Sequence, residues 1–189
     1  MKVGITGGIG AGKSLVCKIF ELYGWKVYYS DDRAKYLMNH DKELVMGIKS
    51  ILGEESYVNG NLNRSFIANR IFNNQDLLKK VNHLVHPAVR KDFKQFSQKY
   101  ENVINEAALL VENGSHKELD KLIVVSAPRE LQINRVRARD LCTEEEVESR
   151  MSKQLSNEKR EAVADFIITN DNNQSLLEQV QAILNQIGY

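Results

Sequence analysis

The chain has 189 residues, of which 42% are hydrophobic, 27% are charged and only two are proline. This composition is typical of a globular protein and excludes a low-complexity or disordered chain. The net charge is +1, so no overall positive field favours a nucleic acid or an anionic membrane as partner. The longest uninterrupted apolar run, Ala107 to Val111, is far shorter than the roughly 20 residues of a membrane helix. We expect a cytoplasmic protein with no membrane or nucleic-acid partner.

Strand and helix patterns alternate along the first forty residues. Val3 to Thr6 is a short β-rich segment, and after a glycine cluster residues 14–23 carry apolar side chains at helical spacing. Gly24 ends that helix, residues 26–29 predict a second strand, and residues 31–39 predict a helix with two carboxylates near its start. The predicted order is strand, helix, strand, helix.

The middle of the chain predicts helices alone. Strand patterns are absent from residue 41 to residue 100, and apolar residues recur at helical spacing from residue 75 to residue 96. Strand-like runs return at residues 102–105, 122–126 and 166–169, and helices are predicted over 128–141 and 175–187. This alternation predicts an α/β fold, a parallel β-sheet flanked by helices on both faces, interrupted by a helical insertion. Ligands of such sheets bind beyond the carboxyl ends of the strands.

Two features have bland interpretations. Cys17 lies in an apolar stripe and is expected in the core, whereas Cys142 has no assigned role. Residues 129–160 are dense in Arg and Glu, which predicts an exposed helical pair that buries little core and is held by pairs such as Glu146 and Arg150.

The strongest motif lies between the first strand and the first helix. Residues 7–14 read GGIGAGKS and match G-x-x-x-x-G-K-[ST]. Glycines let the backbone approach phosphate oxygens, which then meet several N–H groups and the positive end of the helix. The residues expected to bind the nucleotide are Gly8, Ile9, Gly10, Ala11, Gly12, Lys13 and Ser14. The motif predicts nucleoside triphosphate binding.

Within this motif two side chains have distinct predicted roles. Lys13 reaches the β- and γ-phosphates, and the Ser14 hydroxyl completes the shell of a Mg²⁺ ion that arrives with the nucleotide. A carboxylate after an apolar strand is also expected near Mg²⁺, and the candidates are Asp31, Asp32 and Glu106. Position in the sequence alone does not show which of these carboxylates lies near Mg²⁺. No Asn-Lys-x-Asp sequence occurs, which disfavours a switch GTPase.

Asp31 has two interpretations. It follows the second predicted strand, which we expect to neighbour the phosphate loop, so its carboxylate is placed to accept a proton from an attacking hydroxyl group. Asp31 equally suits the N-cap of the next helix. Asp32 is expected to be only a first-turn charge.

The sequence resembles the dephospho-CoA kinase family over nearly the whole chain. Residues 6–14, TGGIGAGKS, are similar to that family's T-G-G-I-G-[SA]-G-K-[ST]. Further matches follow in family order: Ser30-Asp31, His86-Pro87 with Arg90, residues 109–112, Gln132 with Arg135, Arg139-Asp140, Arg150 with Gln154, Ala164-Asp165 and Asn170. The resemblance implies ATP-dependent phosphorylation of the ribose 3′-hydroxyl of dephospho-CoA, the last step of coenzyme A synthesis, with ATP and Mg²⁺.

The resemblance also implies a domain organisation. A single phosphate-loop kinase domain covers residues 1–189, and its core comprises residues 1–31, 101–139 and 163–189. A helical CoA-binding insertion covers residues 32–100, and a lid covers residues 140–162.

The resemblance carries over individual roles where positions match. Asp31, Lys13 and Arg139 are the expected catalytic residues, and Asn170 is expected at the adenine edge. The residues expected to face dephospho-CoA are His86, Arg90, Leu110 and Glu112.

The arginine-rich block takes on a further meaning from the resemblance. Arg135 and Arg139 are one helical turn apart, and like charges at that spacing repel unless an anion lies between them. A triphosphate would supply the anion, and Arg150 is a further candidate for contacting it.

The sequence departs from the family pattern at two positions. Tyr29 replaces the first Asp of a D-x-D pattern, and Ala108 replaces a Pro before two leucines. Two other functions stay open: a kinase for another small alcohol or nucleoside monophosphate, and an ATP-binding module without transfer activity. The intact Lys13, Ser14 and Asp31 disfavour the second.

Overall fold

The computed structural model describes residues 1–72 and 74–189. These residues form two compact units, of which one comprises Met1–Tyr28 with Tyr100–Tyr189 and the other Tyr29–Lys99. We call them the sheet unit and the helical unit. No helix within the described ranges combines the length and the apolar character needed to cross a membrane.

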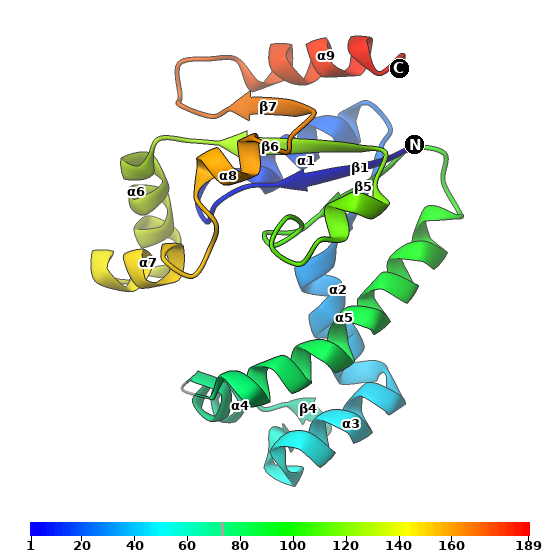
Figure 1. The fold of residues 1–189 in the computed structure, drawn as a ribbon, viewed down its shortest axis with the longest axis vertical. Coiled ribbons are helices and arrows are strands. Elements are labelled where there is room, and N and C mark those ends of the chain that lie inside the picture. Colours follow the sequence, from blue (N-terminus) through cyan, green and yellow to red (C-terminus); the bar gives the residue numbers. More distant parts are fainter. Residues whose placement is uncertain (73) are drawn as a thin grey trace. The chain divides into compact units, whose positions relative to one another are not determined.

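A parallel sheet forms the centre of the sheet unit (Figure 1). β1 pairs in parallel with β5 and β6, and β6 pairs in parallel with β7. The strand order is β2-β5-β1-β6-β7. The strands are β1 (Lys2–Thr6), β2 (Lys26–Tyr29), β5 (Val103–Glu106), β6 (Lys121–Ser126) and β7 (Phe166–Thr169). The predicted α/β class and parallel sheet are confirmed.

Helices cover both faces of this sheet. α1 packs against β1, β5 and α9, and α8 packs on β6. Side chains alternate between the two faces of a strand, and all four of the residues 122–125 on β6 are at most 3% exposed. The helices are α1 (Lys13–Leu22), α6 (Arg129–Asp140), α7 (Glu144–Met151), α8 (Asn157–Glu161) and α9 (Leu176–Gln186), with a 3-10 turn at Ser115–Glu118.

The strand order corrects one expectation. We predicted that the second strand neighbours the phosphate loop, but β5 lies between β2 and β1. Both neighbours of β1, β5 and β6, lie after residue 100 in the sequence. Hydrophobic patterns identify strands but do not show which strands pair with each other.

The arginine-rich block buries more than predicted. Ile133, Val136 and Val147 are at most 7% exposed and pack with Cys142 and Met151. Spacing of three residues places the first two on one face of α6, and α7 then covers them. Cys17 is fully buried, as expected, and burial raises the pKa of its thiol well above the ordinary range.

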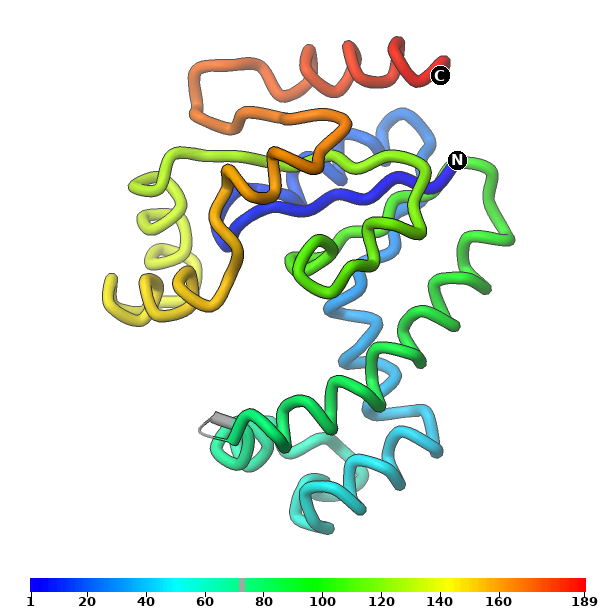
Figure 2. The backbone as a smooth tube through the Cα atoms, in the orientation of Figure 1, coloured from blue at the N-terminus to red at the C-terminus, as the bar shows by residue number. Residues whose placement is uncertain are grey.

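The helical unit contains four α-helices among its described residues, together with a 3-10 turn at Glu54–Ser56. They are α2 (Ser30–His40), α3 (Lys42–Leu52), α4 (Arg64–Phe72) and α5 (Gln75–Ser97). Their core centres on Ile48, Leu52, Val81 and Val85. Figure 2 shows that α5 is bent, and it contains Pro87, which removes one helical hydrogen bond.

A small hairpin in the helical unit was not predicted. β3 (Tyr57–Val58) pairs antiparallel with β4 (Asn61–Leu62). Asn59 and Gly60 connect them and both have positive φ, 50° and 77°, as a tight hairpin turn requires. Two residues per strand are too few to show the alternation of a strand, so the prediction of helices alone over residues 41–100 was wrong here.

Candidate active site

The phosphate loop joins β1 to α1 and is closely packed from behind. Gly12 has φ +95°, and a Cβ atom there would lie 2.1 Å from Nδ2 of Asn170. A Cβ atom on Gly10, where φ is +77°, would lie 2.5 Å from the carbonyl oxygen of Gln132. Both positions therefore require glycine, because a side chain would meet strained backbone and a fixed neighbour.

The start of α1 is open to an anion. Its N-cap is Gly12, with no side chain to bind the first N–H groups, and its first turn holds no acidic residue. Lys13 Nζ donates to the carbonyl oxygens of Gly7 and Gly8 at 3.1 and 3.3 Å, so the ammonium group lies against the loop. Ser14 is exposed. A helix N-terminus and an ammonium group in one place are the two features that commonly bind phosphate groups.

A turn after β7 supports the loop. Asn170 Nδ2 donates to the carbonyl oxygen of Ala11 at 2.8 Å. Arg135 in turn donates to the carbonyl oxygen and Oδ1 of Asn170, both at 3.2 Å, and to Oδ1 of Asn172 at 2.6 Å. The amide of Asn170, expected at the adenine edge, thus binds the loop itself, and a contact with adenine stays a prediction.

Arg139 has a separate set of partners. Its guanidinium donates to both carboxylate oxygens of Asp140 at 2.7 and 3.0 Å, and Arg150 donates to the same carboxylate at 2.7 Å. The hydrogen bond from Arg139 is the main reason that the pKa of Asp140 is lowered to about 2. Arg135 and Arg139 thus each have hydrogen-bond acceptors within the protein, and a contact of either with a triphosphate stays a prediction. Arg139 is 62% exposed, so its guanidinium remains accessible.

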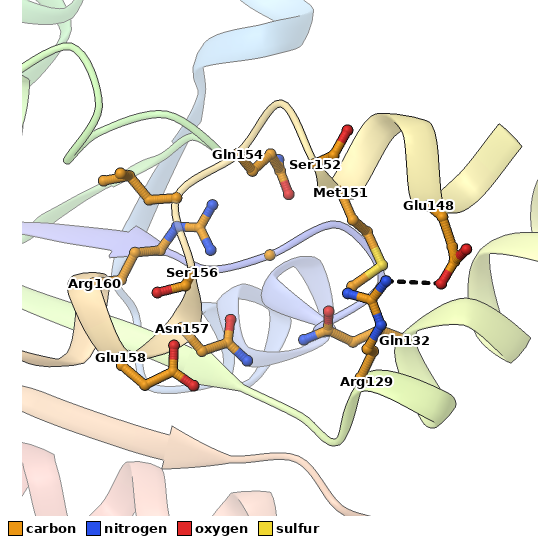
Figure 3. Close-up of a pocket in the computed structure, with 12 residues that line it drawn as sticks. Arg129, Gln132, Glu148, Met151, Ser152, Gln154, Ser156, Asn157, Glu158 and Arg160 are labelled. Atoms are coloured by element: carbon orange, nitrogen blue, oxygen red, sulfur yellow. Dashed lines mark hydrogen bonds and ion pairs between the residues drawn. The ribbon is translucent and has the colours of Figure 1, made fainter. Parts of the chain in front are cut away.

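A pocket of about 320 Å³ lies beside the phosphate loop (Figure 3). Gly8 lines it on one side, and α6 and α7 contribute Gln132 and the exposed ion pair between Arg129 and Glu148 at 2.8 Å. Gln132 is 1% exposed, and its Nε2 donates to the carbonyl oxygen of Ala127 at 3.0 Å. The remaining lining comes from residues 151–160.

Residues 152–156 connect α7 to α8, and we call them the strap. Oε1 of Gln154 accepts a hydrogen bond from the backbone N–H of Ile9 at 3.0 Å. The N–H of Leu155 donates to Oε1 of Glu112 at 3.2 Å, and Nη2 of Arg160 in α8 donates to the same oxygen at 2.7 Å. The strap is thereby tied to the phosphate loop and to the loop after β5.

Two residues expected to face dephospho-CoA have structural partners in the loop after β5. Leu110 is 2% exposed and packs with Ala107, Leu122 and Val124, so its side chain belongs to the core, and a contact of Leu110 with dephospho-CoA stays a prediction. Glu112 forms the ion pair with Arg160 instead of standing open in the site. This pair cannot be recognised from sequence spacing, because its members are 48 residues apart.

The carboxylates considered for Mg²⁺ lie in different places. Asp31 is exposed in the first turn of α2, whose N-cap is Tyr29, so the interpretation of Asp31 as an N-cap was wrong. Asp32 is exposed and pairs with Lys35 at 2.7 Å. Glu106 is 8% exposed and ends β5, where it lies in register with Ile5 of β1. Among the three, Glu106 is on the strand next to β1.

His86 and Arg90 lie one turn apart on α5, in the helical unit. His86 is half-buried and Arg90 is exposed. Burial, with the nearby charges of Arg90 and His83, lowers the pKa of His86 below 6.5. His86 is therefore neutral at pH 7, when it can both donate and accept a hydrogen bond.

Comparison with known proteins decides the family. A family model described as dephospho-CoA kinase matches residues 1–175. The chain belongs to the dephospho-CoA kinase family. A relative named dephospho-CoA kinase from Bacteroides fragilis (strain YCH46) is 35% identical over 187 residues, which cover 97% of this chain and 91% of the relative.

Solved structures agree with this kinase family in fold. A crystal structure of a Thermus thermophilus protein is 30% identical with a TM-score of 0.87, covering 100% of this chain and 98% of that one. A dephospho-CoA kinase from Campylobacter jejuni is 24% identical with a TM-score of 0.71, covering 99% of this chain and 98% of that one. At that identity the second comparison supports the fold alone.

Proposed function

We propose that this chain transfers the γ-phosphoryl group of ATP to the ribose 3′-hydroxyl group of dephospho-CoA and so forms coenzyme A. The observation that carries the proposal is a complete phosphate loop in a chain that matches the dephospho-CoA kinase family along its length. A cytoplasmic location is part of the proposal, because ATP is the donor.

The phosphate loop supports ATP as the donor. Gly10 and Gly12 have positive φ and no space for a Cβ atom, and α1 begins without a capping side chain or an acidic residue in its first turn. In the proposal Lys13 and the loop N–H groups bind the β- and γ-phosphates, residues 8–14 surround them, and Asn170 supports this loop from behind at 2.8 Å.

Two oxygen ligands suit Mg²⁺, which favours hydroxyl and carboxylate oxygens. The hydroxyl of Ser14 is exposed at the start of α1, and the carboxylate of Glu106 ends the strand next to β1. Mg²⁺, when bound with ATP, neutralises charge on the phosphates. Ser14 and Glu106 would hold and orient it.

The remaining roles follow the family resemblance. Asp31, exposed at the positive end of α2, accepts the proton of the attacking 3′-hydroxyl group. Arg139 stabilises the charge of the transferring phosphoryl group. His86 and Arg90 bind dephospho-CoA, Arg90 as a phosphate-binding cation and His86 as a neutral hydrogen-bonding group. Glu112 acts on the substrate only indirectly, by anchoring the strap.

Two segments have functions in this proposal. Residues 32–100 bind dephospho-CoA, and residues 140–162 act as a lid that excludes water from the phosphoryl group. Both boundaries stay predictions. They are testable separately, because Arg90 belongs to the first segment and Arg150 to the second.

A coupled ADP-release assay across dephospho-CoA, AMP and shikimate tests the function. We expect turnover with dephospho-CoA and a product heavier by one phosphoryl group. Lys13→Ala is the control, with transfer reduced by about 10³-fold or more and an unchanged fold, since the side chain of Lys13 is only half-buried. Preference for AMP or shikimate would make the chain a kinase for another acceptor, and near-normal turnover by folded Lys13→Ala would refute the ATP site.

Arg90→Ala tests the acceptor side. We expect weaker binding of dephospho-CoA with unchanged ATP affinity, since Arg90 lies on α5 and the phosphate loop belongs to the other unit. Titration calorimetry measures both. Equal losses for the two ligands would contradict the assignment of Arg90.

A further inference from the structure

The strap occupies a hydrogen-bond donor of the phosphate loop. Ile9 is the third residue of the motif, and its N–H donates to Oε1 of Gln154 at 3.0 Å. Backbone N–H groups of such a loop are the donors that bind phosphate oxygens. In this structure one of them is satisfied by a neutral amide from a residue 145 positions later.

The strap holds Gln154 in place from the other side. The N–H of the next residue, Leu155, donates to Oε1 of Glu112 at 3.2 Å, and the same oxygen accepts from Arg160, whose side chain is 1% exposed. This buried anchor fixes the backbone beside Gln154. The amide of Gln154 is therefore held against Ile9 by the anchored backbone beside it.

The phosphate loop does not depend on Gln154 for its shape. Asn170 binds the carbonyl oxygen of Ala11, and Gln132 and Val136 lie against Gly10 from behind. Loss of the Gln154 side chain would therefore leave the loop formed and its N–H at Ile9 open. Gln154 therefore competes with a phosphate group for the N–H of Ile9, and its hydrogen bond is not needed to form the site.

An arriving triphosphate is the stronger acceptor. A hydrogen bond from N–H to a charged phosphate oxygen is roughly twice as strong as one to a neutral amide. We propose that Gln154 is a positioning residue that accepts the hydrogen bond of the Ile9 N–H until a phosphate oxygen of ATP takes its place. The need to displace Gln154 lowers the affinity for ATP, and its displacement frees the strap from the phosphate loop when the nucleotide binds. This inference rests on the proposed function in one respect, that ATP binds at the phosphate loop.

Titration calorimetry with ATP and Mg²⁺, in the absence of an acceptor, tests the exchange. Gln154→Met removes the acceptor and keeps the length of the side chain. We expect the Kd for ATP to fall by about 2- to 10-fold, the ratio that corresponds to one net hydrogen bond. Gln154→Glu keeps the shape and puts a carboxylate on the same donor, so we expect the Kd to rise about 10-fold or more.

A matched control uses the same change elsewhere. Gln181 is exposed on α9, and Gln181→Met should leave the Kd unchanged. A variant with a damaged fold would not bind ATP more tightly. A lower Kd for Gln154→Met would therefore show that Gln154 competes with ATP and does not merely stabilise the loop. An unchanged or higher Kd for folded Gln154→Met overturns this inference alone, as does unchanged affinity of Gln154→Glu. Failure of the wild-type chain to bind ATP would overturn the proposed function as well.

Discussion

The buried pair between Glu112 and Arg160 gives an asymmetric stability prediction. The side chain of Arg160 is 1% exposed and that of Glu112 is 17% exposed, and their nearest atoms are 2.7 Å apart. Glu112→Gln leaves a guanidinium buried without a counter-charge, which costs about 3 to 5 kcal/mol. Arg160→Met leaves a carboxylate on a side chain that is 17% exposed, and its Oε1 still accepts from Leu155, so we expect about 1 to 3 kcal/mol. The glutamate variant should be the less stable.

Denaturant unfolding of both variants measures this difference, and thermal unfolding checks it. For a chain of this size each kcal/mol shifts Tm by about 2 to 4 °C, so Glu112→Gln should lower Tm by roughly 6 to 20 °C. Glu148→Gln is the control, since it breaks a pair of similar length, 2.8 Å, whose side chains are 61% and 48% exposed, and should cost about 1 kcal/mol or less. A loss for Glu112→Gln no greater than for this control, or smaller than for Arg160→Met, would refute the reasoning.

The pair also predicts the result of removing both charges. Oε2 of Glu112 and Nε of Arg160 are buried without a hydrogen-bond partner among the described residues, so the pair does not satisfy all its own groups. Replacing both residues with apolar ones removes two desolvated charges together. We expect Glu112→Leu combined with Arg160→Met to be more stable than Glu112→Gln alone, by the same unfolding measurement.

Three further predictions concern the site. Asp31→Asn should lower kcat roughly 10²-fold or more with an unfolding free energy within about 1 kcal/mol of wild type, whereas Asp32→Asn should be near wild type in steady-state assays; the reverse order would show that Asp32 is the base. Because burial and nearby cations lower the pKa of His86 below 6.5, the folded state binds fewer protons than the unfolded state. The unfolding free energy of the protein should therefore be highest above pH 6.5, and it should fall as the pH drops from 6.5 toward the lower pKa that His86 has in the folded state. This pH dependence should be smaller in His86→Gln, and an equal slope in both proteins would contradict the prediction. Gly12→Ala places a Cβ atom 2.1 Å from Asn170 Nδ2 at φ +95°, so it should cost about 1 to 3 kcal/mol in unfolding and weaken ATP binding in calorimetry; an unaffected variant would mean that the loop adapts.

The sequence predicted the helices and strands that depend on interactions between residues close together in the chain. β7 lies at the predicted residues 166–169, and α6 and α9 begin and end within one residue of expectation. The apolar runs and helical spacing are properties of short segments, so they can be recognised without tertiary contacts. The hairpin at residues 57–62 was missed because its strands are too short to show a period.

The candidate site divides in the same way. The phosphate loop is eight consecutive residues, and its backbone geometry follows from its own glycines. The bonds of Gln154 to Ile9 and of Arg160 to Glu112 join residues 145 and 48 positions apart. Their types and spacings suit exposed polar groups equally well, so only the tertiary structure distinguishes them. Leu110 is the opposite case. From the family resemblance it was expected to face the substrate, but in the structure its side chain packs in the core.

The pairing of the first strand has a consequence for synthesis of the chain. Lys2 of β1 lies opposite Val103 of β5, and Val3 lies opposite Lys121 of β6. At about 5 to 20 residues per second, β1 leaves the ribosome roughly 5 to 20 s before either neighbour exists. During that interval the helical unit, which is continuous in sequence, can form first, while both edges of an apolar strand stay open to other chains. Newly made chains should therefore aggregate most readily when synthesis stalls shortly before residue 103.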